Sequence, residues 1–206
     1  KEKLSKNYIN AVGWKSNQRY LLIESDDWGT IRMPSREVYE VLLKNNIEVD
    51  KFSFDKHDAL ETSDDLSCLF EALKCVKDSK GNHAVLTAYH VMANPNFEAI
   101  EANGRKEYVF ESILETYTRN PHTEKSFQLI KQGIDEGIYI PQFHGREHIH
   151  VKRWMEAINS NSQKEQLAFE NKAIISTKST VCSNHYLKNY FAGQDYLDPS
   201  EFESLE

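Results

Sequence analysis

Short apolar runs alternate with amphipathic segments along most of the chain, and this alternation predicts strands and helices in turn. Three nearly continuous apolar runs are typical of strands buried on both faces: residues 20–24, 84–92 and 138–143. Helical spacing is seen in residues 35–46 with Ser35 as N-cap, from Ser63 onward, and after Asn120-Pro121. A fourth helix is expected within residues 151–171, and a turn is expected at Asn94-Pro95-Asn96.

The order of these elements predicts an α/β fold. Strands separated by at least one helix form parallel βα units, which leaves a doubly wound sheet or a (β/α) barrel open. In both architectures, functional side chains lie where strands end and loops begin. The length of 206 residues suits a single domain, with residues 1–18 as an N-terminal extension.

A pair of carboxylates follows the first predicted strand. Asp26 and Asp27 are adjacent, and two carboxylates beside a buried strand are costly to desolvate unless a positive charge compensates them. A divalent cation would do so, with one aspartate as a ligand and the other free to act as a base. A turn with a helix N-cap is the alternative explanation for this pair.

A histidine cluster follows the third predicted strand. His144 and His148 are four residues apart, and imidazole is the commonest side-chain ligand for zinc and similar metals. Gly145 would let the backbone turn sharply so that the two rings converge. The alternative is a solvated loop, which is disfavoured because three of the eight histidines fall within seven residues.

The same residues also match a second metal motif. His144, Glu147 and His148 fit the His-x-x-Glu-His pattern of the inverted zinc proteases, in which a helix presents two ligands and a glutamate base. The segment before His144 has a strand pattern, and Gly145 is a poor second residue for a helix. These two features disfavour the protease interpretation.

Composition limits the partners that the chain is expected to bind. Its formal net charge of −7 disfavours a nucleic-acid partner, which would select a concentrated basic face. No apolar run approaches the roughly 18 residues of a transmembrane helix. The polar N-terminus lacks an apolar signal core, which slightly favours a cytoplasmic location and leaves export open. The sequence does not indicate the oligomeric state.

A strand ending in Asp-Asp and a later strand ending in His-x-x-x-His together resemble the polysaccharide deacetylase family, which has the NodB homology fold. Glu24-Ser25-Asp26-Asp27-Trp28-Gly29 stands where the family has Thr/Ser-Phe-Asp-Asp-Gly, and residues 144–148 stand where it has His-Ser/Thr-x-x-His. Trp28 stands at a family glycine, Gly145 replaces a hydroxyl residue, and Ile149 follows where proline is common. The family's later motifs are not matched. The resemblance therefore implies a divergent member with a (β/α) barrel of the NodB type, either complete or truncated.

This resemblance implies a metal-dependent hydrolase that removes N-acetyl groups from a carbohydrate. Asp26 would be the base, while Asp27, His144 and His148 would hold one divalent metal. Zn²⁺ is the expected ion, with Co²⁺ or Ni²⁺ as alternatives. Two other classes stay open: a metal-dependent glycoside hydrolase of related barrel fold, and a non-catalytic module that binds glycan or metal.

Five further residues are expected around this site. Trp28, Asn94 and Arg146 are expected to contact substrate, and the aromatic face of Trp28 suits a sugar ring. Core packing is a nearly equal alternative for Trp28, and a turn role is favoured for Asn94. Glu147 and His150 are expected to orient the metal ligands.

The sequence does not identify the general acid that would protonate the leaving amine. His90, at the end of the second predicted strand, and His150 are candidates on position alone. Asp58 and Glu61 precede the second predicted helix, where a capping or loop role is favoured over a place in the cleft.

Overall fold

The computed structural model describes residues 13–51 and 53–176, and these form a mixed α/β fold. The strands are β1 (Glu24–Trp28), β2 (Leu86–His90), β3 (Ala93–Pro95), β4 (Phe110–Ser112) and β5 (Tyr139–Phe143). The helices are α2 (Arg36–Lys44), α3 (Ser53–His57), α4 (Ser63–Cys75), α5 (Phe97–Ala102), α6 (Ile113–Arg119), α7 (Ser126–Asp135), α8 (Val151–Ile158) and α9 (Gln163–Glu170). A single 3-10 turn, η1 (Val49–Lys51), precedes α3.

A parallel three-stranded sheet forms the centre of the fold. Its order is β1-β2-β5, so the two strands that end in the predicted site flank β2 on either side. β3 and β4 form a separate antiparallel pair. The predicted α/β class with parallel strands is confirmed. Within the described residues the sheet is open, with β1 and β5 at its edges, and no closed barrel is detected there.

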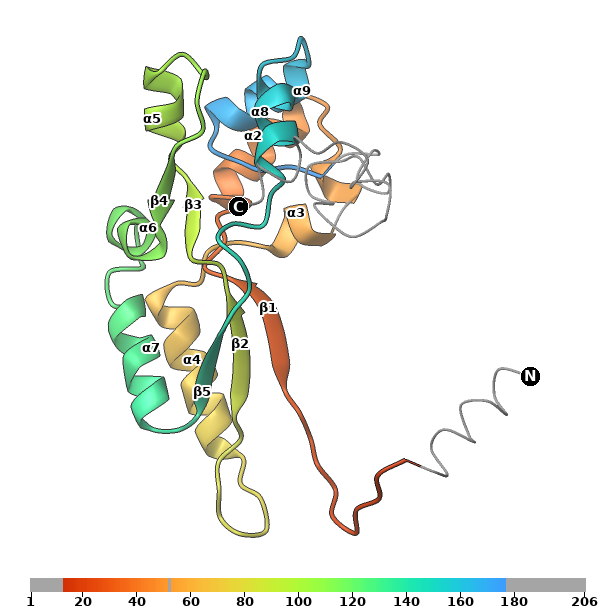
Figure 1. Ribbon diagram of the computed structural model, residues 1–206, viewed down its shortest axis with the longest axis vertical. Coiled ribbons are helices and arrows are strands. Elements are labelled where there is room, and N and C mark those ends of the chain that lie inside the picture. The colour runs from red at the N-terminus through yellow and green to blue at the C-terminus, as the bar shows by residue number, and fades with distance from the viewer. Residues whose placement is uncertain (1–12, 52, 177–206) are drawn as a thin grey trace, which may run out of the picture.

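Two helices pack against one face of this sheet, as Figure 1 shows for α4 and α7. Their buried side chains form one apolar core with the inward-facing residues of β2. Leu66 and Phe70 come from α4, Ile130 from α7, and Leu86 and Ala88 from β2. This core fixes the sheet against its helices below the end of the strands where the polar residues gather.

Two further apolar clusters lie beyond the sheet, among the elements at the top of Figure 1. One surrounds the buried Trp154 of α8 and includes Phe97 of α5 and Phe169 of α9. The other joins α2 to the extended segment 173–176, whose Ile174 N donates to Arg32 O over 2.9 Å. These clusters hold the loops that follow the strands in place.

The first strand was predicted at the wrong position along the chain. It runs from Glu24 to Trp28 rather than over residues 20–24, and Tyr20, Leu21 and Leu22 are 69%, 86% and 75% exposed. The pairing explains the shift, because β2 begins only at Leu86 and offers β1 no partner before Ile23. Apolar composition alone therefore misplaced the strand and predicted burial on both faces where only one is covered.

The helix predictions were better, with clear exceptions. Ser35 caps α2 as expected, and α4 begins at Ser63, where Thr62 and Asp65 form a capping box. The predicted fourth helix is instead two, α8 and α9. The expected turn at residues 94–96 is wrong, because Asn94 and Pro95 lie in β3 and Asn96 caps α5.

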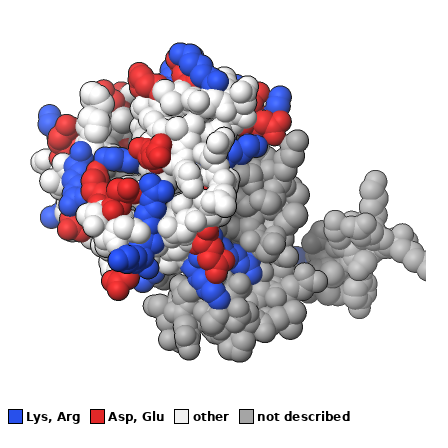
Figure 2. Space-filling model, turned by 90° about the horizontal axis from the view of Figure 1, so that it is seen from above, with Lys and Arg blue, Asp and Glu red and all other residues white. Residues whose placement is uncertain are grey.

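Among the described residues, no helix is long and apolar enough to cross a membrane. Basic and acidic side chains lie interspersed on the described part of the face in Figure 2.

We predict that Gly133→Ala destabilises the fold. Gly133 is buried on α7, and an added Cβ would lie 2.7 Å from Phe70 Cζ and 3.0 Å from Tyr139 Cβ. Overpacking of this kind costs about 1–3 kcal/mol, which outweighs the gain of up to about 1 kcal/mol in helix propensity. Urea unfolding measures the change, with exposed Gln128→Ala on the same helix as the control. An unchanged free energy of unfolding in Gly133→Ala would contradict the prediction and would mean that α7 can shift away from Phe70 at no cost in stability.

Candidate metal centre

A bulge at the end of β1 gives Asp26 and Asp27 different surroundings. The register of β1 against β2 shifts between Ser25 and Trp28, so the two aspartates together stand opposite one residue of β2. Asp27 has a φ of 63°, in the left-handed region that aspartate tolerates better than most residues. As a result, Asp26 is exposed and Asp27 is half-buried.

The loop after β5 brings the two imidazoles to the same place. His144 N continues the strand pairing by donating to His90 O over 2.8 Å. Gly145 then adopts a φ of 123°, which reverses the chain as its identity predicted. Ala93 N donates to Arg146 O over 2.7 Å, so the loop is fixed to the segment after β2.

This loop contradicts the inverted zinc-protease interpretation. That motif requires a helix to present both histidines, whereas the structure has no helix between β5 and α8. His144 and His148 converge instead because the loop curls back.

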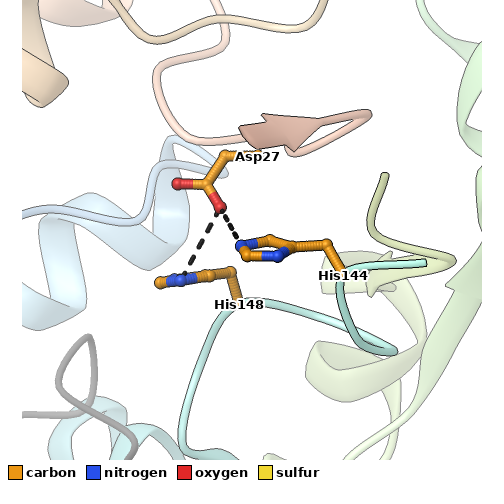
Figure 3. Close-up of side chains that lie close together, drawn as sticks. All are labelled: Asp27, His144 and His148. Carbon is orange, nitrogen blue, oxygen red and sulfur yellow. Dashed lines mark ion pairs between the residues drawn. The ribbon is translucent and has the colours of Figure 1, made fainter. Parts of the chain in front are cut away.

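Asp27, His144 and His148 meet as predicted, and Figure 3 shows the carboxylate facing both rings. Asp27 Oδ1 lies 3.1 Å from His144 Nε2 and 3.6 Å from His148 Nε2. The two rings are stacked with centroids 5.6 Å apart. The three side chains are 20–29% exposed, so the cluster is shielded but open to solvent.

The donor set fits a divalent cation. Two ligands on a tetrahedral ion with bonds of about 2.1 Å stand about 3.4 Å apart, close to both Asp27 distances. Asp27 Oδ1 is buried and makes no hydrogen bond among the described residues, although both imidazoles lie within ion-pair distance of it. A cation held between the carboxylate and the two rings would satisfy this oxygen. The three side chains could therefore hold a metal ion.

A small pocket adjoins the cluster. Its volume is about 10 Å³, which is room for roughly one water. Asp27, His148, Arg32 and Glu147 are among the residues that line it. A single water held here would lie next to two of the three candidate ligands.

A buried charge cluster forms one side of this region. Arg32 is 7% exposed, its Nε lies 3.5 Å from Asp55 Oδ1, and its Nη1 lies 3.7 Å from Asp58 Oδ2. Burial raises the pKa of Asp58 to about 6, opposed by Arg32 and assisted by the charges of Asp27 and Asp26. Asp58 lies in the loop directly after α3, and its N–H donates to Phe54 O over 2.8 Å.

The structure gives Trp28, Arg146 and Glu147 protein partners. Trp28 packs edge-on against Tyr139, with ring centroids 5.7 Å apart, at the margin of the sheet core. Arg146 donates to Glu147 through Nε and Nη2 over 2.6 and 2.7 Å, and its guanidinium lies 5.0 Å from the Phe110 ring centroid. Their expected contacts with substrate or with the ligands stay predictions.

Neither histidine proposed as general acid lies in the open part of the site. His90 is 8% exposed, and its Nε2 lies 2.7 Å from Tyr139 OH within the core. His150 is 1% exposed, and its side chain caps α8 by accepting from Arg153 N. The expected role of His150 in orienting the ligands stays a prediction.

Sequence reasoning missed the residues that hold the loop after β1. Asn94, expected to contact substrate, is 1% exposed and is bonded to the backbone of residues 29 and 31. Glu61 accepts from Gly29 N, while Thr62 rather than Glu61 caps α4. Arg32 gave one usable signal, a charged residue between the apolar Ile31 and Met33. Substrate contact by Asn94 stays a prediction.

We predict that His144→Ala loses metal binding. Titration of metal-free protein with Zn²⁺ should give a rise in melting temperature for the wild type, because ligand binding stabilises the folded state. Losing one of three protein ligands should weaken binding by roughly 100-fold or more, judged against the 10–100-fold typical of outer-shell changes. Exposed His83→Ala is the matched control and should bind as the wild type does. Equal Zn²⁺ affinity in both variants would argue against this cluster as the metal site.

We predict that the lowered pKa of the buried His90 makes the protein less stable in mild acid. Burial lowers its pKa from 6.5 to about 4, so the unfolded chain takes up a proton below pH 6.5 that the folded protein does not. Stability is therefore lost as the pH falls from about 6.5 toward 4, by about 2 kcal/mol from this residue between pH 7 and 5. Urea unfolding of His90→Gln at both pH values should show a correspondingly smaller drop than the wild type. The same drop in both proteins would assign the pH dependence to other groups.

Comparison of the chain with protein-family models, with curated proteins and with solved structures finds no match in any of the three.

Proposed function

We propose that this protein is a metal-dependent hydrolase that removes an N-acetyl group from a carbohydrate. The observation that carries the proposal is the convergence of Asp27, His144 and His148 from two segments more than a hundred residues apart. Its motifs resemble those of the polysaccharide deacetylases, which use this set of ligands with a neighbouring aspartate. Zn²⁺ is the proposed ion, with Co²⁺ or Ni²⁺ as alternatives.

The chain's own residues account for two parts of the reaction. A bound divalent cation would supply a Lewis acid that polarises the acyl oxygen and increases the acidity of water. Asp27, His144 and His148 would hold it as three protein ligands. Asp26, adjacent in sequence but exposed, would accept the proton from the attacking water.

The pocket beside the cluster has room for about one water next to two of the proposed ligands, Asp27 and His148. Asp26 is not among the residues that line it, so its role as the base is supported by its adjacency to Asp27 and by the resemblance. The carbohydrate substrate itself rests on the resemblance, and the group that protonates the leaving amine is not assigned.

Two alternative functions are distinguished by product analysis. A glycoside hydrolase of related fold would release new reducing ends, whereas a deacetylase would release acetate. A non-catalytic module would bind metal or glycan and release neither. The protease alternative is not proposed, because its helix is absent from the described residues 144–150.

We predict that Asp26→Asn separates chemistry from metal binding. Loss of a general base typically lowers the rate by about 10²–10⁴-fold, and Asp26 is not among the three ligands. Acetate release from N-acetylated chito-oligosaccharides by Zn²⁺-loaded protein should fall by at least about 100-fold, with Zn²⁺ affinity close to that of the wild type. Exposed Asp135→Asn is the control for removing a carboxylate elsewhere. Full activity in Asp26→Asn would refute the base assignment. If neither the wild type nor any variant releases acetate, the deacetylase proposal is refuted.

A further inference from the structure

The turn that follows Asp27 is held by one buried side chain from β3. Asn94 Oδ1 accepts from Ile31 N over 2.9 Å, and its Nδ2 donates to Gly29 O over 2.8 Å. The same Nδ2 donates to Thr116 Oγ1 over 3.2 Å. Asn94 therefore uses its oxygen and both amide hydrogens within the protein. Such a side chain has no hydrogen left with which to bind a further acceptor.

Other contacts restrict this turn from different directions. Gly29 N donates to Glu61 Oε2 over 3.1 Å, and Glu61 also accepts from Tyr117 OH. Gly29 has a φ of 83°, and a Cβ there would lie 2.6 Å from Ile113 Cδ1. The backbone after Asp27 is therefore bonded on two sides and closely packed on a third.

The conformation of Asp27 requires this support. Aspartate tolerates the left-handed region better than most residues, but the conformation of Asp27 is still unfavourable without surroundings that determine it. Thr30 N donates to Asp27 O over 3.3 Å, which closes the turn that Asn94 holds at Gly29 and Ile31. Releasing those two bonds would let the bulge relax, and the Asp27 carboxylate would move away from the two imidazoles.

We propose that Asn94 is a positioning residue for the metal centre, which it serves by fixing the turn after Asp27 so that this carboxylate faces His144 and His148. The inference rests on the metal centre of the proposed function but not on the reaction or its substrate. The observed partners of Asn94 already account for this positioning role.

The test compares two variants of Asn94 with a matched control at its third partner. Asn94→Ala removes all three bonds, and Asn94→Asp keeps the side-chain volume but loses both donated hydrogens. Thr116→Val removes the bond from Nδ2 and the bond that Thr116 Oγ1 donates to Glu111 Oε1, and it leaves both Asn94 bonds to the turn. Thr116 is fully buried, so the control also carries a loss of stability. Urea unfolding of the metal-free proteins measures that loss, and circular dichroism confirms that each is folded.

Metal binding is then measured without reference to activity. Zn²⁺ affinity comes from competition with a chromophoric chelator, and the absorption spectrum of the Co²⁺-loaded protein reports the ligand geometry. Both Asn94 variants should bind Zn²⁺ about 10–100-fold more weakly than the wild type, with an altered Co²⁺ spectrum. Thr116→Val should bind within about twofold of the wild type, because the turn keeps both of its bonds.

The possible results separate this inference from the proposed function. Wild-type affinity and spectrum in folded Asn94→Asp would overturn the positioning role. An equal loss in Thr116→Val would overturn it too, since the effect would then follow stability alone. Failure of the wild type to bind Zn²⁺ or Co²⁺ would overturn the metal centre and this inference with it. The expected pattern in a protein that releases no acetate would support the positioning role and reject only the hydrolase.

Discussion

The metal centre depends on the bulge in β1. Side chains alternate along a regular strand, and Ser25 already lies on the helix-covered face, opposite Ala88. Without the bulge, Asp27 would take the next place on that apolar face and Trp28 would turn away from it. The extra residue places Trp28 opposite His90, where it packs against Tyr139, and leaves the Asp27 carboxylate at the edge of the sheet. The bulge thus lets Trp28 pack in the core and places Asp27 beside the two histidines.

The three candidate ligands could be predicted because a general rule of parallel sheets brings them together. The carboxyl ends of parallel strands lie at one edge, so polar residues at the ends of β1 and β5 were expected to meet there. Asn94 and Glu61 could not be assigned in this way. Their partner Gly29 lies 65 and 32 residues away, and no periodic pattern connects them with it. Their roles follow from tertiary contacts between loops.

The accuracy of the fold prediction followed the length of the elements. Helices α2 and α4 have nine and thirteen residues, enough to show a helical pattern and capping residues. β3, β4 and α5 have three, three and six residues, too few for any period, and only a turn at residues 94–96 was predicted there. The first strand failed for another reason. An apolar run shows that a segment can be buried but does not show where its partner strand begins.

One face of the sheet is left uncovered by the described helices, and this bears on the (β/α) barrel that the resemblance implies. Parallel sheets are normally covered on both faces, and α4 and α7 cover only one here. Glu24, Thr87 and Ile140 share a row on the other face, where Ile140 is 45% exposed. A barrel wall has this construction, with helices outside and a row of side chains facing the interior. The wall would also place the ends of β1 and β5 at the rim, where barrel enzymes carry their active sites. Among the described residues the sheet has three strands and is open, so the one-sided covering fits either architecture and the barrel stays a prediction.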